Sequence, residues 1–196
     1  ERALAHHVGL SHVFKMVKAF REKDTQTPII LMGYANPIEA IGAEAFVERA
    51  KTADVDGIIT VDYPPEECMQ FTKLLKEKNI DSIFLLSPTS ELNRVKLIIE
   101  QASGFLYYVS LKGVTGAANI DIEQVKSKVG MIRELTDLPI GVGFGVRDAA
   151  TAKEVAKISD AVVVGSRMVQ EIENSNQENL IQNISKLMQE LREAVN

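Results

Sequence analysis

The chain has 196 residues, of which 45% are hydrophobic and 25% charged, and its formal net charge is −5. This length and balance are those of a globular protein with a sizeable core, and the negative charge argues against a surface for nucleic acid or anionic membrane. No apolar run approaches the ~20 residues that a membrane-spanning helix needs. The single cysteine, Cys68, excludes an internal disulfide and favours a reducing, cytoplasmic location.

Short apolar runs alternate along the chain with amphipathic stretches of ten or more residues. The runs are nearly continuous in Ile, Val, Leu, Phe and Tyr, which is typical of parallel strands buried on both faces. In chain order, the expected strands are 29–32, 57–61, 82–86, 105–109, 140–144 and 161–164. The stretches between and after them predict amphipathic helices, among them 38–49, 66–77 and 180–195.

This alternation predicts βα units with right-handed crossovers. A doubly wound sheet of six strands would place its ligand-binding glycines near the first strand, whereas the glycine turns here follow the last three. The pattern therefore predicts a TIM (β/α)₈ barrel of which this chain carries about the last six βα units, as a single domain over 1–196. Two more units of roughly 60 residues would approach the ~250 residues typical of the fold. Because Glu1 is not a methionine and helix-like residues follow it without a cap, we expect the N-terminal strands to be missing.

Three glycine-centred turns follow expected strands in the C-terminal half. They are GVTG at 113–116, GFG at 143–145 and GS at 165–166. A strand, a glycine turn and a helix start leave backbone N–H groups free to bind a phosphate, and the last two turns match the phosphate corner of a barrel. The alternative is that GS is a plain helix cap. The first turn opens a longer polar loop, which either closes over a ligand or is a plain surface loop.

Aromatic and acidic side chains lie at or near the expected C-terminal strand ends, where barrels bind ligands. Tyr34 and Phe144 are candidates to wall a flat apolar pocket and Tyr107 adds a hydroxyl, although a single aromatic residue there more often fills the core. Asp62 is the only strand-end carboxylate, and it also fits a cap of the following helix. Apart from Asp62, the sequence offers no obvious general acid or base, and it shows no metal-ligand set.

Six motifs occur in an order and spacing that resemble one family: LMGYANP at 31–37, VDYPPEE at 61–67, FLLSPTS at 84–90, YYVSLKGVTG at 107–116, GVGFG at 141–145 and VVVGSRMV at 162–169. Over its whole length the chain resembles the tryptophan synthase alpha chain. The resemblance implies a (β/α)₈ barrel that cleaves indole-3-glycerol phosphate to indole and glyceraldehyde 3-phosphate in L-tryptophan biosynthesis, with no metal or organic cofactor of its own. It also implies an α₂β₂ assembly with a beta chain that carries pyridoxal phosphate.

The resemblance also implies roles for individual residues. The phosphate ligands would be Gly116, Gly145, Gly165 and Ser166. The indole pocket would be bordered by Met32, Tyr34, Ile59, Leu85, Tyr107, Thr115, Phe144 and Val163, with Thr115 on the closing loop. Asp62 would shape the rim and the contact to the beta chain, and Tyr107 is a candidate auxiliary catalytic group.

The family's two catalytic carboxylates have no counterpart in this sequence. One is a glutamate on the second strand and the other an aspartate in the loop after it, so both belong to a segment before Glu1. We therefore expect this chain by itself to be inactive. Two alternatives stay open: a non-catalytic fragment that binds a phosphorylated ligand or a partner subunit, and another phosphate-binding barrel enzyme, acting on phosphoribosyl or thiamine-precursor substrates.

Overall fold

The computed structural model describes residues 5–110, 121–143 and 145–196. The chain divides into two compact units. Unit 1 comprises Glu1–Phe84 and Leu97–Gly104, and unit 2 comprises Leu85–Lys96 and Phe105–Asn196. The boundary between them falls within β3 (Asp81–Leu86) and α6 (Leu92–Gln101).

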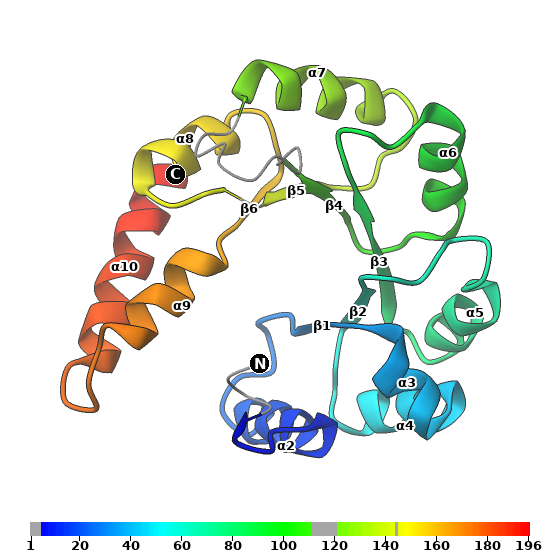
Figure 1. Cartoon of the computed structure of the whole chain (residues 1–196), viewed down its shortest axis with the longest axis horizontal. Helices are drawn as coiled ribbons and strands as arrows, with labels where there is room; N and C mark the ends of the chain where they lie inside the picture. Colours follow the sequence, from blue (N-terminus) through cyan, green and yellow to red (C-terminus); the bar gives the residue numbers. More distant parts are fainter. Residues whose placement is uncertain (1–4, 111–120, 144) are drawn as a thin grey trace. The chain divides into compact units, whose positions relative to one another are not determined.

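Unit 1 is built around a parallel ladder in which β1 pairs with β2 and β2 with β3. Its complete elements are α2 (Leu10–Arg21), β1 (Ile30–Gly33), α3 (Ala35–Ile41), α4 (Ala43–Thr52), β2 (Gly57–Thr60) and α5 (Met69–Glu77) (Figure 1). Met32, Ile59 and Ile83 are register partners across the three strands. These three residues therefore lie in one row on one face of the ladder.

The core of unit 1 lies on the opposite face of this ladder, against the helices. Leu31 and Ile58 pack into a cluster with Phe14, Phe46 and Phe71. The ring centroids of Phe14 and Phe46 are 5.8 Å apart, and those of Phe46 and Phe71 are 6.0 Å apart. Aromatic pairs at such separations bury large apolar areas, so helices α2, α4 and α5 are fixed to the strands through these rings.

Two helix predictions in unit 1 are wrong at their boundaries. The single helix expected over 38–49 is two helices, α3 and α4, because Gly42 between them has φ +84, a conformation that side-chain-bearing residues rarely adopt. The helix expected from residue 66 begins at Met69, with Cys68 as its N-cap residue. Cys68 is buried, and this burial raises the pKa of its thiol to about 11. It is therefore an inert thiol at neutral pH.

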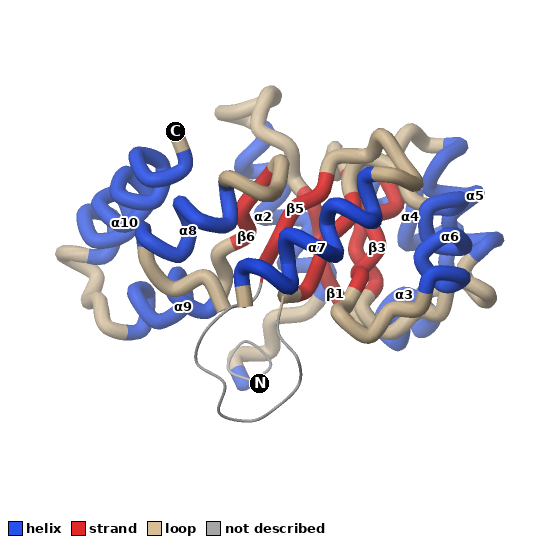
Figure 2. The backbone as a smooth tube through the Cα atoms, turned by 90° about the horizontal axis from the view of Figure 1, so that it is seen from above, coloured by secondary structure: helices blue, strands red, loops and turns tan. Residues whose placement is uncertain are grey.

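Unit 2 also contains a parallel ladder, β4 (Leu106–Val109), β5 (Ile140–Gly143) and β6 (Ala161–Val163). Its helices are α7 (Ile122–Arg133), α8 (Ala149–Ala156), α9 (Ser166–Glu173) and α10 (Leu180–Val195). Helix α10 contacts α8 and α9, and Figure 2 shows α8 and α10 side by side. With β1 to β3, the six strands match the predicted positions to within one residue.

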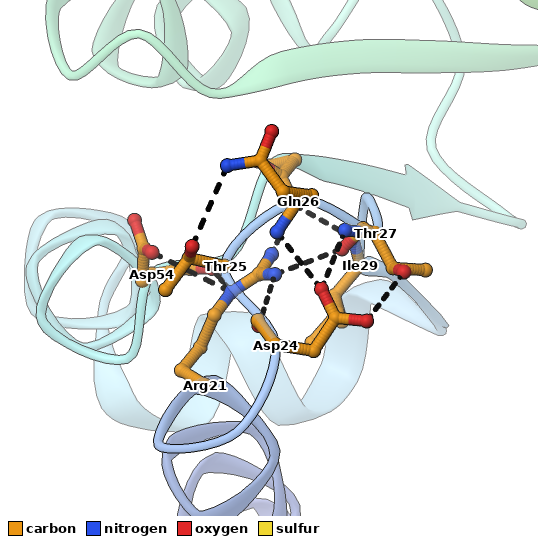
Figure 3. A network of polar contacts seen from close by, with 8 residues as sticks. Arg21, Asp24, Thr25, Gln26, Thr27, Ile29 and Asp54 are labelled. Carbon is orange, nitrogen blue, oxygen red and sulfur yellow. Dashed lines mark hydrogen bonds and ion pairs between the residues drawn. The ribbon is translucent and has the colours of Figure 1, made fainter.

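A network of polar contacts around Arg21, the last residue of α2, lies next to the starts of the strands of unit 1 (Figure 3). The guanidinium donates hydrogen bonds to the backbone carbonyls of Asp54 (2.9 Å) and Thr27 (2.8 Å) and forms an ion pair with Asp56. Asp56 also accepts a hydrogen bond from the backbone N–H of Ile29 at 2.6 Å. One nearly buried side chain thus joins the end of α2 to the starts of β1 and β2.

Unit 2 has a matching arrangement at its own strand starts. Arg133, the last residue of α7, pairs with Asp160 at 2.9 Å. The Asp160 carboxylate also accepts a hydrogen bond from the backbone N–H of Ile140 at 2.8 Å. Both units therefore contain the same three groups. They are an arginine at a helix end, an aspartate before a strand, and a backbone N–H at or one residue before the start of the preceding strand.

Candidate functional site

In unit 2, the C-terminal strand ends form a row that is poor in side chains. Val109, Gly143 and Val163 are register partners, and Tyr107 and Gly141 are partners two residues earlier. Because side chains alternate along a strand, all five residues lie on one face. On this face β5 contributes two glycines and no side chain. Side chains from the neighbouring strands can therefore lie over β5, at the end of the ladder where parallel α/β proteins bind ligands.

The ring of Tyr107 lies over Gly143. A Cβ atom built on Gly143 would be only 2.3 Å from the Tyr107 hydroxyl oxygen, so any side chain at position 143 would displace the ring. Tyr107 is 5% exposed, and burial raises the pKa of its hydroxyl, which keeps the phenol neutral at physiological pH. The carbonyl of Gly143 accepts hydrogen bonds from the Ser110 hydroxyl (2.7 Å) and the Ser110 N–H (3.0 Å). Gly143 is thus fixed by the Tyr107 ring over its Cα and by the hydrogen bonds from Ser110 to its carbonyl.

The helices that follow these strands start in two different ways. Helices α7 and α8 are capped by their own aspartates: Asp121 accepts from the N–H of Gln124 at 3.0 Å and Asp148 from that of Thr151 at 2.8 Å. Helix α9 begins after Gly165, and within the described part of the chain no side chain caps it. The first N–H groups of a helix have no acceptor inside the helix, so this terminus suits an anion.

The other groups of the expected phosphate corner are compatible with this reading. Gly165 and Ser166 are both exposed. Gly145 has φ +86, a value that requires glycine for an unstrained turn. Arg167, the basic residue nearest the terminus in sequence, is paired with Glu171 at 2.7 Å on the same helix. The anion-binding capacity of this corner therefore comes mainly from backbone N–H groups.

In unit 1, two large exposed side chains flank Gly33, the last residue of β1. Met32 is 49% exposed and Tyr34 63% exposed, whereas Ile59, the register partner of Met32, is buried. The Asp62 carboxylate accepts a hydrogen bond from the N–H of Ala35 at 2.7 Å. Unit 1 therefore offers an apolar and aromatic surface next to a carboxylate that is already engaged by the backbone.

A second side chain in the same segment also reaches α3. The hydroxyl of Tyr63 donates a hydrogen bond to the Glu39 carboxylate at 2.5 Å. That bond to a carboxylate raises the pKa of Tyr63 to about 12, since the neutral phenol is the donor. Asp62 and Tyr63 thus bind the start and the middle of the same short helix.

The structure places the predicted site residues in two groups. Unit 1 holds Met32, Tyr34, Ile59 and Asp62, and unit 2 holds Leu85, Tyr107, Gly145, Val163, Gly165 and Ser166. Thr115, Gly116 and Phe144 lie outside the described residues. The expectation that Asp62 caps the following helix is wrong, because its hydrogen bond goes to the preceding helix, α3.

Sequence reasoning missed the contact between Tyr107 and Gly143 and the hydrogen bond between Tyr63 and Glu39. The first had a signal in the sequence, since the glycines of GVGFG fall on alternate positions and hence on one face of a strand. The second had none, because 24 residues separate the two side chains.

Two absences among the described residues bear on function. In that part of the chain, no group of three or more His, Cys, Asp or Glu side chains is placed to hold a metal ion. Among the described helices, none is both long enough and apolar enough to cross a membrane.

Comparisons with known proteins agree on one family. The family model of the tryptophan synthase alpha chain matches residues 1–196. The tryptophan synthase alpha chain of Nitrosomonas europaea is 53% identical over 195 residues, which are 100% of this chain and 71% of that protein. The alpha chain of Thiobacillus denitrificans is 55% identical over the same share of each.

Solved structures give the same result. The crystal structure of tryptophan synthase subunit alpha from Legionella pneumophila superposes with a TM-score of 0.88 at 36% identity, over 99% of this chain and 72% of that one. The six parallel strands with their alternating helices are thus six βα units of the family's (β/α)₈ barrel, as the sequence predicts. This chain belongs to the tryptophan synthase alpha chain family, lyases of tryptophan synthesis.

Proposed function

We propose that this chain binds indole-3-glycerol phosphate as part of an alpha subunit that cleaves it to indole and glyceraldehyde 3-phosphate. In this retro-aldol step the bond between indole carbon 3 and the glycerol chain breaks, the ring carbon takes up a proton, and the adjacent hydroxyl loses one as it becomes a carbonyl. The observation that carries the proposal is the uncapped start of α9 next to the glycine-only face of β5.

The phosphate binds at the strand ends of unit 2 in this proposal. Gly145, Gly165 and Ser166 supply backbone N–H groups, and Ser166 adds its hydroxyl. The contrast with α7 and α8 supports this assignment, because their N-termini are already occupied by aspartate side chains. A dianionic phosphate is the ligand that such an open terminus stabilises best. By the family resemblance, Gly116 completes this group.

The indole ring binds against apolar and aromatic side chains. The residues proposed for this role are Met32, Tyr34, Ile59, Leu85, Tyr107, Thr115, Phe144 and Val163. Exposed Met32 and Tyr34 support the proposal, since large exposed apolar side chains at strand ends are typical of ligand surfaces. The neutral hydroxyl of Tyr107 suits an auxiliary hydrogen-bond donor.

We also propose that these 196 residues bind the substrate without turning it over. The retro-aldol step needs both a general acid and a general base. Asp62 is the only carboxylate among the described residues that lies within two positions after a strand, and it is held by the N–H of Ala35. Tyr107, with its raised pKa, retains its proton and does not act as a base at neutral pH.

The remaining parts of the proposal concern the assembly. We propose that both units belong to one barrel domain, that Asp62 lies at the contact to a beta chain, and that the α₂β₂ complex contains pyridoxal phosphate in the beta chain only. The word "alpha" in the relatives' names supports such a partner. We place the protein in the cytoplasm, where the free thiol of Cys68 stays reduced.

Isothermal titration with indole-3-glycerol phosphate tests the proposal. Ser166→Asp places a negative charge at the start of α9 and should weaken binding at least about tenfold through charge repulsion. Ser185→Asp makes the same change at an exposed position of α10 and is the matched control, with unchanged affinity expected. Equal affinity of both variants, or equal binding of a phosphoribosyl compound by the unsubstituted chain, would contradict the assignment.

A further inference from the structure

Asp62 lies where the β1–β2 ladder ends. The N–H of Val61 donates to the carbonyl of Gly33 at 2.9 Å, so the strand pairing continues one residue beyond β2. This places Asp62 opposite the turn that joins β1 to α3. From there its carboxylate oxygen accepts a hydrogen bond of 2.7 Å from the backbone N–H of Ala35, the first residue of α3.

The residue controlled by this hydrogen bond is Tyr34. Tyr34 is the N-cap residue of α3, has an extended backbone (φ −97, ψ 160) and makes no side-chain cap of its own. Its side chain is 63% exposed, so packing contributes little to its orientation. The backbone on its two sides therefore sets the direction of the ring, with the ladder at Gly33 on one side and the Asp62 hydrogen bond at Ala35 on the other.

Asp62 itself is held in place by its neighbour. The ring of Tyr63 packs against Phe71, with centroids 6.0 Å apart, and Phe71 belongs to the core of unit 1. The Tyr63 hydroxyl donates to Glu39 on α3. The segment that carries Asp62 is thus fixed to the core and to α3, so that the carboxylate can act as a rigid acceptor for the turn.

We propose that Asp62 is a positioning residue that fixes the β1–α3 turn so that Tyr34 meets the indole ring. This inference rests on the proposed function and goes beyond it, because it assigns Asp62 a role within the chain in addition to any partner contact. Asp62 does not touch the reacting atoms in this account. It acts through the N–H of Ala35 alone.

Three measurements on Asp62→Ala test the inference. The amide of Ala35 should exchange its hydrogen about tenfold faster, and the affinity for indole-3-glycerol phosphate should fall about tenfold, the factor that corresponds to the loss of one cap. The affinity for inorganic phosphate should not change, because the phosphate site lies in unit 2. A merely structural loss would weaken both ligands together.

Two companion variants sharpen the test. Asp62→Asn keeps an oxygen acceptor and should restore both the slow exchange and the affinity. Asp24→Ala removes bonds from the backbone N–H groups of Gln26 and Thr27, each 2.8 Å, in the turn between α2 and β1. It should leave the Ala35 amide and both affinities unchanged.

A double-mutant cycle covers the case in which Asp62→Ala folds poorly. Ala35→Pro removes the N–H while proline fits the first position of a helix. If Asp62 acts through that N–H, adding Asp62→Leu or Asp62→Asn to the Ala35→Pro variant should not change its affinity for indole-3-glycerol phosphate.

Several results would overturn the inference. One is an Asp62→Ala variant whose Ala35 amide exchanges at the unchanged rate or whose affinity for indole-3-glycerol phosphate is unchanged. Another is an Asp62→Asn variant that does not restore this affinity. A third is a loss of affinity on substituting Asp62 that is as large in the Ala35→Pro background as in the unsubstituted chain. Failure of the unsubstituted chain to bind indole-3-glycerol phosphate would instead overturn the proposed function, and this inference with it. Binding by the unsubstituted chain and by Asp62→Ala alike would overturn the inference alone.

Discussion

Arg21 in unit 1 and Arg133 in unit 2 occupy equivalent places. Each is the last residue of a 12-residue helix and pairs with an aspartate, Asp56 or Asp160, that precedes the second of the two strands following that helix. They differ in burial, since the side chain of Arg21 is 9% exposed and that of Arg133 is 47% exposed. The same three groups therefore involve a nearly buried arginine in one unit and a half-exposed arginine in the other.

The opposite ends of the strands differ in kind. In unit 1, the exposed side chains of Met32 and Tyr34 flank Gly33 at the end of β1, whereas in unit 2 β5 ends in Gly143 and α9 starts after Gly165 without a side-chain cap from the described residues. In parallel barrels the strand starts serve stability and the strand ends carry function. The two units share the interaction at their strand starts and differ at their strand ends.

The largest expected effect tests the comparison of the two arginines. Arg21→Ala should lower the free energy of unfolding by about 3 kcal/mol, because it removes a nearly buried side chain and leaves the Asp56 carboxylate and the carbonyls of Asp54 and Thr27 without their donor. Arg133→Ala should cost less than about 1 kcal/mol, as expected of an exposed pair. Urea unfolding of both variants measures the difference. Equal costs would show that burial does not distinguish the two networks.

The next largest effect on stability is expected from substituting the glycine at the end of β5. Gly143→Ala should destabilise the protein by about 1–3 kcal/mol, because the new methyl group collides with the ring of Tyr107. Gly33→Ala is the matched control at the end of β1, where no described atom lies within 4 Å of the added Cβ. Its cost should be within about 0.5 kcal/mol. A Gly143→Ala variant as stable as Gly33→Ala would mean that Tyr107 does not rest on Gly143.

The smallest effect concerns Tyr63 and alkaline pH. In the folded chain its pKa is raised from the ordinary value of 10 to about 12, first by the hydrogen bond to Glu39 and then by burial. The protonated phenol is thus favoured by folding, so its contribution to stability is complete below pH 10 and is lost as the pH rises toward 12. The stability difference between the wild type and Tyr63→Phe should shrink between pH 9 and pH 11.5. A constant difference over this range would contradict the assignment.

The sequence predicted the six strands well because each is a short apolar run bounded by turn residues. The split between α3 and α4 at Gly42 escaped prediction, because the apolar spacing continues across the break and only the left-handed backbone reveals it. Arg21 lies beside Glu22, Lys23 and Asp24, a pattern that reads as a charged surface. Its burial depends on Asp56, 35 residues away, which no local pattern encodes.

The candidate site was predicted in part for a related reason. Glycine turns and strand-end aromatics are local signals, so the positions around Gly145, Gly165 and Tyr34 could be found from sequence. The hydrogen bond between Asp62 and Ala35 joins two turns 27 residues apart and depends on strand register. The alternative that Asp62 caps the following helix therefore failed, because the sequence does not show the register.

Amide chemical-shift mapping with inorganic phosphate and then with indole-3-glycerol phosphate tests the central claim most directly. The claim is that unit 2 binds the phosphate and unit 1 contributes to binding the ring. It predicts that phosphate alone shifts the amides of Gly145, Gly165 and Ser166 in a saturable manner, and that the indole compound adds shifts at Tyr34 and Ala35. The largest phosphate shifts at the aspartate-capped starts of α7 and α8, or none at Gly165 and Ser166, would contradict it.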